Sequence, residues 1–521
     1  MPDHTQEEYD AIVVGSGATG GWAAKELTER GLTVLVLEAG PALRASDLGA
    51  PTTNAEPWQT RRAIQKRHPA CNSDTYHLFV DDIANPFTTP KDRPFDWIRS
   101  RQVGGRTLLW GGVTFRMSDY EFKAASLDGF GQDWPVSYRE LEPFYDRVET
   151  FLGITGSTER IPHLPDGKYV ATPQLTAGEQ LFKRAVERRW KDRQVIPGRA
   201  VARQARTELD PEWTVASSTG SSLAAARNTG RMDLRPSSIV RKILVNTNTA
   251  KANGVALVDA QTGQEREVRS KVVILCASTI ESIRLLFNSA SRQHPEGIGN
   301  SSGLLGRYVM DHTKVGIFGT CPGPVPVELG PPVGGSNSIY VPRFRNLSDR
   351  HPRFIRGYGM FGAVQRQGMP ENTGIALSIH GEQLPVFENR ITIDSGTTDA
   401  WGIPVAHIDC VHSDNDRHMA ADALDCAREM FAEAGFAVTT EVGSLANPGW
   451  LIHEIGGARM GEDRKTSVLN RFNQVWDCPN VVVVDGASWV SGGCQNPTLT
   501  MMAFTVRACQ FVADELERGA L

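Results

Sequence analysis

Long hydrophobic runs and an excess of positive charge are both missing from this 521-residue chain. Its apolar runs, such as those within residues 271–276 and 481–484, are far shorter than the ~20 residues of a membrane-spanning helix. The chain opens on polar and acidic residues without the basic start and apolar core of a secretory signal, so we expect a cytoplasmic protein. With 55 basic and 60 acidic residues, the formal net charge of −5 offers no electrostatic footprint for nucleic acid or an anionic membrane.

Cysteine is also scarce, with eight residues that never form a C-x-x-C pair. This frequency is too low for a dense disulfide framework, so we expect mostly reduced thiols. The sequence has no C-x-x-C-H motif for haem attachment. His407, Cys410, His412 and His418 are spaced like metal ligands, but on a strand His407 and His412 would point to opposite faces. A half-buried strand is the preferred interpretation, and we expect no metal site.

The residues that are abundant are typical of a soluble enzyme. Hydrophobic residues make up 40% of the chain and charged residues 22%, which excludes a disordered protein. Fifty glycines and thirty prolines predict many tight turns and argue against a coiled coil or a helical array. At ~150 residues per domain the length suggests three or four domains, although large single units can absorb as much chain.

A strand, a helix and a second strand follow one another near the start of the chain. Residues 10–15 form an apolar run rich in β-branched side chains, residues 19–29 have helical spacing, and residues 32–38 form a second apolar run. Such a unit has parallel strands joined by a right-handed crossover. The strand-to-turn pattern returns at residues 272–278 and 481–488, each followed by a predicted helix. We therefore expect a dinucleotide-binding domain assembled from the start, middle and end of the chain.

The intervening segments have other patterns. Residues 178–190 and 417–435 predict helices, the second of them amphipathic. Residues 385–412 predict alternating strands that are broken by a turn near Gly396. The stretch 322–343 is rich in proline and glycine and indicates an excursion or lid.

A glycine-rich turn joins the first predicted strand to the first helix, with the G-x-G-x-x-G spacing of dinucleotide-binding proteins: Gly15, Gly17, Ala18, Thr19 and Gly20. The first glycine permits the tight turn, the second lets the backbone approach a pyrophosphate, and the third lets helix and strand pack closely. Glu38, followed by Ala39, ends the second strand, where a carboxylate can accept hydrogen bonds from ribose hydroxyls. These residues predict nucleotide binding rather than a merely structural turn. They argue against a 2′-phosphate but leave FAD and NAD open.

Three later segments carry a family resemblance. Residues 103–116, 453–461 and 496–503 are similar to those of the glucose-methanol-choline (GMC) oxidoreductases, two-domain FAD enzymes that oxidise alcohols. Within that family the chain most resembles pyranose oxidases and glycoside 3-oxidases, also at residues 385–389 and 398–404. The resemblance implies an α/β fold in which a Rossmann-like FAD-binding domain carries an inserted α+β substrate-binding domain on a mainly antiparallel sheet. The implied FAD-binding ranges are 1–134, 231–314 and 450–521, and the implied substrate-binding ranges are 135–230 and 315–449.

The resemblance also implies which residues contact FAD. Besides the glycine-rich turn, Glu38 and Ala39, they are Gly104, Gly105, Thr107, Trp110, Gly111, Gly112, Val240, Ala277, Asp485, Gly486, Asn496, Pro497 and Thr498. Leu109 stands where some pyranose oxidases attach FAD covalently through a histidine, and since leucine cannot make that bond we expect non-covalent FAD. Gly111 stands where such oxidases can carry a threonine beside flavin N5, which leaves the efficiency of a reaction with oxygen open.

Oxidation of a secondary alcohol needs a base for the hydroxyl proton and a donor that holds the oxygen. The resemblance assigns these roles to His453 and Asn496, and histidine, with an unperturbed pKa of ~6.5, suits the first. From the residues alone, His453 could be a structural core histidine, and Asn496 could cap a helix that has Pro497 at its first position. Asp311 and His312 could reach the same site, although a structural hydrogen bond is the preferred interpretation.

The substrate side is less defined, with Glu382, Gln383 and Leu451 as candidate contacts. We expect FAD-dependent oxidation of the C3 or C2 hydroxyl of a pyranose sugar or glycoside, with electrons passing to O₂, a quinone or another acceptor. The alternatives are a flavoprotein dehydrogenase subunit that serves a haem partner, a non-redox lyase of the same fold, and an NAD-dependent dehydrogenase. The sequence leaves open whether the chain forms a homo-oligomer.

Overall fold

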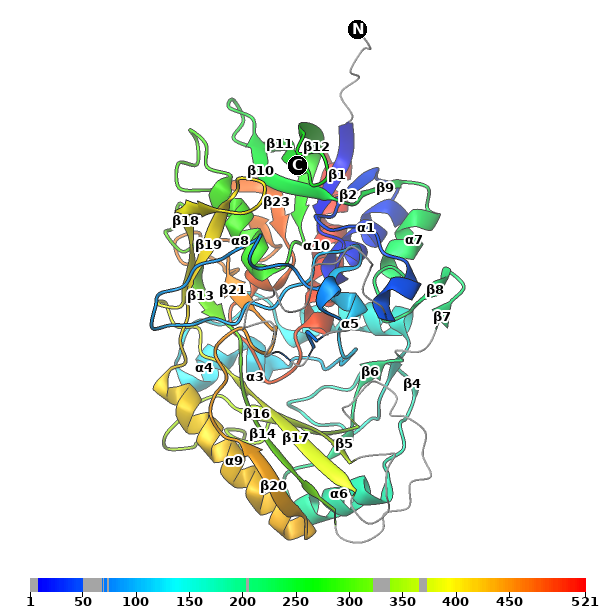
Figure 1. The fold of residues 1–521 in the computed structure, drawn as a ribbon, viewed down its shortest axis with the longest axis vertical. Coiled ribbons are helices and arrows are strands. Elements are labelled where there is room, and N and C mark those ends of the chain that lie inside the picture. The colour runs from blue at the N-terminus through cyan, green and yellow to red at the C-terminus, as the bar shows by residue number, and fades with distance from the viewer. Residues whose placement is uncertain are drawn as a thin grey trace.

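The computed structural model is built around two large sheets, which lie at the upper and lower ends of the view in Figure 1. It describes residues 8–49, 68, 70–72, 75–202, 206–321, 338–364 and 373–521. The upper sheet has eight strands with a parallel centre, and the lower sheet has six antiparallel strands. Helices cover both, so the predicted α/β fold class is confirmed.

The centre of the upper sheet joins strands from three distant parts of the chain. β1 (Glu8–Val14) pairs in parallel with β2 (Val34–Leu37) and with β12 (Glu265–Leu275), and β12 pairs in parallel with β23 (Cys478–Val483). Residues 11–14 are all buried, because a parallel sheet covered on both faces needs continuous apolar strands. The apolar runs thus predict these strands correctly. The sheet is completed by β9 (Met232–Arg235), β10 (Ser238–Val245), β11 (Ala252–Asp259) and β22 (Gln474–Val475).

Three helices follow the parallel strands. They are α1 (Ala18–Glu29) after β1, α8 (Thr279–Asn288) after β12, and α10 (Thr498–Glu517) after β23. α1 packs against α10 and against α7 (Ser222–Asn228), and α10 also packs against α5 (Tyr138–Leu152). Because these helices begin beyond the carboxyl ends of parallel strands, their first turns meet at one edge of the sheet, where ligands of such folds bind.

The lower sheet is antiparallel throughout. Its strands in spatial order are β20 (Ala437–Val442), β14 (His312–Thr320), β17 (Gly374–Glu382), β16 (Tyr358–Val364), β15 (Ile339–Val341) and β5 (Ile196–Pro197). α9 (Asp414–Ala434) packs against β14 and β17, and α6 (Ala177–Arg189) packs against α9. α9 begins three residues before its predicted start because Ser413 and Asp416 form a capping box there.

A third, four-stranded sheet links the two ends, in the order β19 (Pro404–Asp409), β18 (Arg390–Thr398), β13 (Arg307–Met310) and β21 (Ile455–Gly457). The predicted turn near Gly396 is wrong, since Gly396 lies inside β18. The chain turns instead at residues 399–403, where Asp399 Oδ1 accepts the backbone N–H groups of Trp401 and Ile403. The side chain of the first residue after β18 therefore fixes the turn, which a search for glycine alone misplaces.

The remaining elements are short. They are η1 (Ala45–Gly49), η3 (Tyr76–Leu78), η4 (Gly105–Leu108), α3 (Asp119–Phe122), α4 (Ala124–Asp128), β3 (Ile154–Thr155), β4 (Tyr169–Ala171), β6 (Ala200–Val201), β7 (Arg206–Thr207), β8 (Asp210–Thr214) and η5 (Gly486–Ser488). Most of the proposed excursion, residues 322–337, lies outside the described residues. The domain ranges of the sequence analysis stay a prediction.

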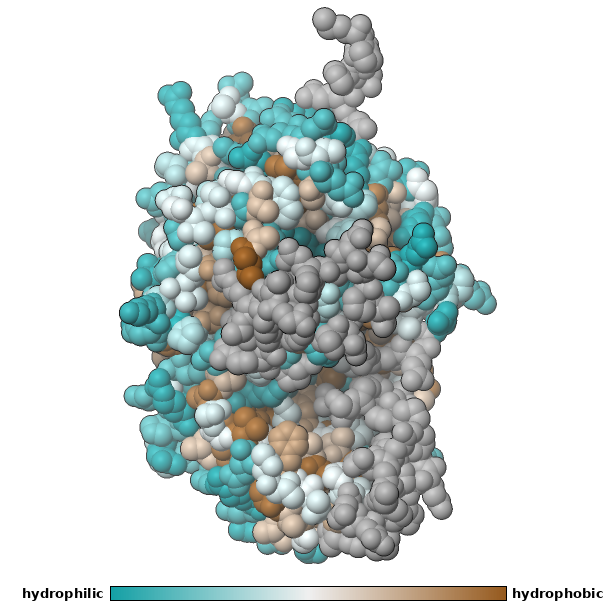
Figure 2. Space-filling model, viewed as in Figure 1, coloured by the Kyte–Doolittle hydropathy of each residue, from teal (hydrophilic) through white to brown (hydrophobic). Residues whose placement is uncertain are grey.

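Figure 2 shows mainly hydrophilic residues over the upper part of the visible face, and hydrophobic residues gathered lower down, over β14, β17 and β20. Phe318, Val438 and Val442 are exposed on β14 and β20. All eight cysteines are buried, and none forms a disulfide. Among the described helices, none combines the length and the apolar character that a membrane span requires.

Candidate active site

One cavity of about 640 Å³ runs from the glycine-rich turn at α1 to the strands β14, β16 and β17. Both predicted catalytic residues, His453 and Asn496, and the predicted substrate contact Leu451 line it. The predicted cofactor residues on its wall are Gly15, Gly17, Ala18, Thr19, Glu38, Ala39, Gly105, Thr107, Trp110, Gly111, Val240, Ala277, Asp485, Gly486, Asn496, Pro497 and Thr498. Gly20, Gly104 and Gly112 are described but are not part of the wall.

The three glycines of the fingerprint have different neighbours. A Cβ on Gly15 (φ +100°) would lie 2.4 Å from Cys276 O, and a Cβ on Gly20 would lie 2.0 Å from Gly15 O. A Cβ on Gly17 would meet only Gly105 Cα, at 4.0 Å. Gly15 and Gly20 are therefore required by the packing of strand, turn and helix, whereas the space beside Gly17 is open to the cavity. This open space next to the first turn of α1, which has no side-chain cap, fits a pyrophosphate.

Glu38 lies at the end of β2, on the cavity wall. Its Oε2 accepts the backbone N–H of Ser16 at 3.1 Å and the Ser16 hydroxyl at 2.5 Å, and its Oε1 accepts the backbone N–H of Gly40 at 2.9 Å. Burial raises the pKa of Glu38 above its usual value. The carboxylate is thus held rigidly beside the glycine-rich turn, in the position where a ribose hydroxyl would donate to it.

A second glycine turn touches the first. Gly104 (φ +89°) and Gly105 (φ +53°) are left-handed, and a Cβ on Gly105 would lie 3.1 Å from Gly17 Cα. Thr107 supports this turn, because its hydroxyl donates to Gly104 O and accepts the backbone N–H of Ser218. Leu109 lines the cavity in the same segment. A bound dinucleotide would therefore be held between two backbone turns.

Asp485 is the N-cap of η5 and lines the cavity. Its Oδ1 accepts the backbone N–H of Ala487 at 3.0 Å, and its Oδ2 accepts the Ser282 hydroxyl of α8. Burial raises the pKa of Asp485 to about 6. A Cβ on Gly486 would lie 2.4 Å from Thr279 Oγ1, so this backbone can approach α8 only as glycine.

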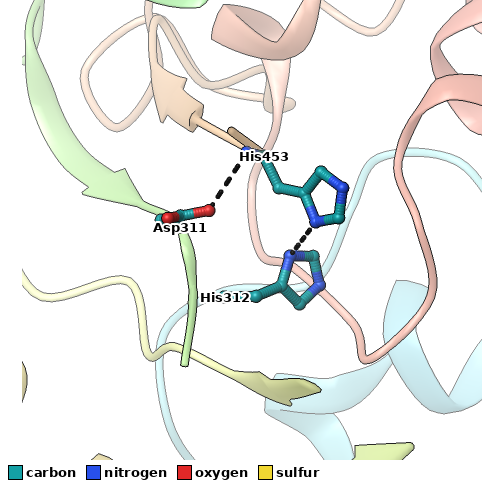
Figure 3. A group of neighbouring side chains, drawn as sticks. All are labelled: Asp311, His312 and His453. Carbon is teal, nitrogen blue, oxygen red and sulfur yellow. Dashed lines mark hydrogen bonds between the residues drawn. The ribbon is translucent and has the colours of Figure 1, made fainter. Parts of the chain in front are cut away.

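His453 lies in the loop before β21, next to Asp311 and to His312, the first residue of β14 (Figure 3). Its backbone N–H donates to Asp311 Oδ1 at 3.1 Å, its Nδ1 lies 3.1 Å from His312 Nδ1, and its Nε2 lies 3.5 Å from Asn496 Nδ2. Burial, together with the nearby positive groups, holds the pKa of His453 well below its usual value. The imidazole is therefore neutral at neutral pH, as a general base requires.

Asn496 is not a helix cap. α10 begins at Thr498, its N-cap is Pro497, and no side chain caps it. The Asn496 amide turns instead toward His453, and its buried Oδ1 has no hydrogen-bond partner among the described residues. The N-cap interpretation is therefore wrong, and the amide has hydrogen-bonding capacity left for a ligand.

Sequence reasoning missed a polar wall made by the lower sheet. Lys314 of β14 pairs in register with His380 of β17, and both side chains line the cavity with Ser378 and Phe361. Ser378 Oγ lies 3.1 Å from His380 Nε2, and the His380 ring lies 4.4 Å from the Phe361 ring. The alternation of residues 312, 314 and of 378, 380 along two strands was the available signal, because such residues share a face.

Two predicted substrate contacts do not reach the cavity wall. Glu382 is fully buried and its carboxylate pairs with Arg356 at 2.9 Å, while burial raises its pKa to about 7. Gln383 accepts the backbone N–H of Asp311 and donates to Val411 O. Both side chains are occupied by the packing of the strand ends, which the sequence pattern does not reveal.

Potential metal ligands gather in one place within the described part of the chain, where ligand atoms of Asp311, His312 and His453 lie within 4.8 Å of one another (Figure 3). Both carboxylate oxygens of Asp311 accept backbone N–H groups, and the two histidines are hydrogen-bonded to each other. These atoms therefore already have partners, which favours a hydrogen-bonded cluster over a ligand set. His407 bonds Thr88 instead, and His412 bonds Ala446 O.

Comparisons with known proteins agree with this geometry. Family models described as GMC oxidoreductase match residues 9–314 and 385–505. The chain is 30% identical to 2-methyl-1,2-propanediol dehydrogenase of Mycolicibacterium austroafricanum over 97% of its length and 95% of that protein. It is 24% identical to C-glycoside 3-oxidase of Arthrobacter globiformis, covering 98% and 96%. A solved structure of an Aspergillus oryzae formate oxidase variant, studied for FAD modification, superposes with a TM-score of 0.68 at 15% identity, covering 99% of this chain and all of that one, and shows the shared fold.

Proposed function

This chain belongs to the GMC oxidoreductase family, and we propose that it oxidises a secondary hydroxyl, at C3 or C2, of a pyranose sugar or glycoside to the keto-sugar. One observation carries the proposal. His453 and Asn496 both line the cavity that continues to the dinucleotide turns, His453 Nε2 lies 3.5 Å from the Asn496 amide nitrogen, and the buried Asn496 Oδ1 has no hydrogen-bond partner among the described residues. A substrate there would meet both a base and a hydrogen-bonding group beside a bound cofactor.

FAD is the cofactor of this family, and the residues present fit it. The open space at Gly17 suits the pyrophosphate, and Glu38 suits the ribose. Once bound, the flavin supplies the acceptor for the substrate hydride at its N5. We propose that the binding is non-covalent, because Leu109 lines the cavity in the segment that would lie along the flavin, and a leucine side chain cannot form a bond to it.

The residues of the chain then have separate tasks. His453 Nε2 accepts the hydroxyl proton, since the neutral imidazole is the form that its buried site favours. Asn496 holds the hydroxyl oxygen, which fixes the direction of the C–H bond. Leu451 and Phe361 cover apolar parts of the cavity and exclude water from it.

The polar wall supports a polyhydroxylated substrate. Lys314, Ser378 and His380 provide donors and acceptors on the side of the cavity near His453, and Phe361 provides a flat apolar surface beside them. Sugar rings combine hydroxyl edges with apolar faces, so this mixture suits a pyranose. The similarity to a C-glycoside 3-oxidase favours C3 over C2.

A second candidate is a small diol, favoured by the 30% identity to 2-methyl-1,2-propanediol dehydrogenase. The electron acceptor is proposed to be O₂, a quinone or another acceptor. Gly111 lies on the cavity wall and does not choose between these acceptors. A haem-bearing partner and a non-redox lyase are the remaining alternatives.

Product analysis tests the proposal. FAD-loaded protein is incubated with glucose, phenyl β-glucoside or 2-methyl-1,2-propanediol, under air and again with an electron-accepting dye, and the product is examined by ¹³C NMR. A ketone carbon at C3 or C2 of a sugar supports the proposal. Turnover of the diol but of neither sugar would contradict the sugar proposal and indicate a small-alcohol substrate. Turnover only after addition of a co-purified haem protein would indicate a dehydrogenase subunit.

Acid precipitation tests the mode of FAD binding. Because leucine cannot bond to the flavin, acid should release all of the FAD into the supernatant. A yellow pellet after washing would contradict non-covalent binding.

A further inference from the structure

We propose that His312 is a positioning residue that sets the tautomer of His453, so that the bare nitrogen of His453 is the Nε2 atom that faces the cavity. This inference rests on the proposed function, in which His453 accepts the hydroxyl proton. It assigns a role to a buried histidine that the proposed chemistry leaves unused. A chain of three hydrogen-bonding groups runs from the Gly493 carbonyl through His312 to His453, and Figure 3 shows its two histidines.

The first link fixes the proton of His312. Its Nε2 lies 2.7 Å from the backbone oxygen of Gly493, and a carbonyl oxygen can only accept, so Nε2 carries the hydrogen. His312 is buried, and burial lowers its pKa to about 4. A neutral imidazole has one N–H group, and therefore His312 Nδ1 is bare and can only accept.

The second link passes this constraint to His453. The two Nδ1 atoms lie 3.1 Å apart, and the rings meet edge to face at 82°. Because His312 Nδ1 cannot donate, the hydrogen between them belongs to His453 Nδ1. The opposite tautomer of His453 would bring two bare nitrogens together in a buried site and would lose this hydrogen bond.

The third link is the reactive atom. With its hydrogen on Nδ1, neutral His453 has a bare Nε2, and this atom faces Asn496 and the cavity. When the substrate hydroxyl gives its proton to Nε2, the Nδ1–H bond to His312 is kept, so the same contact stabilises the imidazolium. No proton leaves the pair in this step.

Other charged and titratable groups surround the pair. Lys314 of β14, His380 of β17 and Arg106 of η4 all act on His453, and each opposes a positive charge on it. Asp311 stands next to His312 and holds the His453 backbone. None of these groups has a hydrogen bond to His453 Nδ1 within the described structure, so His312 is the partner that sets the proton at Nδ1, and the Asn496 amide nitrogen, 3.5 Å from Nε2, favours the same tautomer.

Two isosteric substitutions separate the links. In His312→Asn the amide oxygen lies near the former Nδ1 and keeps an acceptor for His453, but the bond to Gly493 is lost. In His312→Gln the amide nitrogen reaches toward Gly493, but the acceptor for His453 is lost. His312→Leu removes both links and keeps the bulk. FAD content and thermal midpoint report whether each variant is folded and loaded.

The direct readout is the tautomer itself, from ¹⁵N NMR of histidine-labelled protein, with His453→Asn identifying the resonance of His453. We expect the Nδ1–H form in the wild type and in His312→Asn, and loss of that form in His312→Gln and His312→Leu. The rate of flavin reduction by substrate should fall about 100-fold in His312→Gln and His312→Leu, and only a few-fold in His312→Asn. The acid limb of the kcat/KM pH profile should move in His312→Gln and His312→Leu but not in His312→Asn.

Several outcomes would overturn the inference. One is an Nε2–H form of His453 in the wild type. Another is an equal loss of rate in the Asn and Gln variants with the pH profile unchanged, which would mean that His312 acts only through packing. If neither a sugar nor a diol reduces the flavin of the wild type while the ¹⁵N result holds, the proposed function fails and the tautomer assignment stands.

Discussion

Beside His453 the main chain adopts a conformation that β-branched residues rarely take. Ile452 has φ +61°, in the left-handed region, and such a residue costs of order 1–3 kcal/mol. Asp311 offsets this strain, because its carboxylate accepts the backbone N–H groups of Gly449, Leu451 and His453. Arg106 also donates to Ile452 O. A buried carboxylate thus holds the backbone that presents the candidate base.

The substitution Asp311→Asn tests this arrangement at the residue scale. An amide would turn a donor toward one of the three N–H groups, so we expect the free energy of unfolding to fall by about 1–3 kcal/mol. Flavin reduction should slow while FAD binding persists. Burial raises the pKa of Asp311 to about 7. The two proteins should therefore be compared at pH 8, where the wild-type carboxyl group is ionised.

The matched control for this test is Asp414→Asn, in an exposed first turn of α9, which should change stability by less than about 0.5 kcal/mol. Wild-type stability and rate in Asp311→Asn would show that the carboxylate does not hold the loop.

Among the secondary-structure elements, one acidic residue ties α8 to two other segments. Glu281, in the first turn of α8, pairs with Arg99 at 3.2 Å, Arg101 at 3.3 Å and Arg284 at 3.1 Å. Arg284 also pairs with Asp399 at 2.7 Å, in the turn between β18 and β19. The charges of these arginines, outweighing burial, lower the pKa of Glu281 to about 2.

The pH dependence of stability follows from that shift. Because the folded-state pKa lies below the ordinary value of 4.5, the carboxylate contributes fully above pH 4.5, and its contribution is lost as the pH falls toward about 2. Glu281→Gln should therefore lower the free energy of unfolding by about 3 kcal/mol at pH 7. The difference from the wild type should narrow as the pH is lowered from 4.5. Urea unfolding at a series of pH values measures it.

The control for the Glu281 test is Glu267→Gln, in a partly exposed pair with Arg269 on β12, which should show less than about 1 kcal/mol at any pH. If the difference in the free energy of unfolding between wild type and Glu281→Gln does not change with pH, the Glu281 carboxylate does not contribute stability through its ionised form.

The turn between β1 and α1 offers a matched pair of alanine variants. Gly20→Ala would place a Cβ 2.0 Å from Gly15 O, so we expect a less stable protein with or without FAD. Gly17→Ala meets no protein atom closer than 4.0 Å, so the apoprotein should keep its thermal midpoint while its affinity for FAD falls at least tenfold. Calorimetry measures the thermal midpoint of each variant, and fluorescence titration with FAD measures its affinity for FAD. An unchanged FAD affinity in Gly17→Ala would argue against a pyrophosphate at this turn.

For the molecule as a whole, the sequence predicts local features better than assembled ones. The βαβ unit and the fingerprint are predictable because strand, turn and helix are contiguous and each glycine has a local reason. The residues that gather around His453 are not predictable from the sequence. His312 and His380 come from strands of a sheet whose register depends on packing between distant parts of the chain. The family resemblance singles out His453 and Asn496 but says nothing of their hydrogen bonds.

Particular errors show the same limit. Asn496 has the sequence of an N-cap, yet its amide faces a histidine that lies 43 residues away in the chain. Glu382 and Gln383 are candidate substrate contacts, yet Glu382 pairs with buried Arg356, and Gln383 bonds the backbone of Asp311 and Val411. In each case a tertiary contact overrides a local preference, which a single sequence does not record.

In the proposed reaction a sugar hydroxyl gives its proton to His453, and the carbon that carries this hydroxyl gives its hydride to a bound flavin. The most direct measurement is an anaerobic absorbance titration of FAD-loaded wild type and His453→Ala, matched in FAD content, with glucose and phenyl β-glucoside. We predict that the band near about 450 nm bleaches in the wild type and persists in the variant. Equal bleaching in both proteins would contradict the role of His453, and no bleaching of the wild type by either sugar would contradict the carbohydrate assignment.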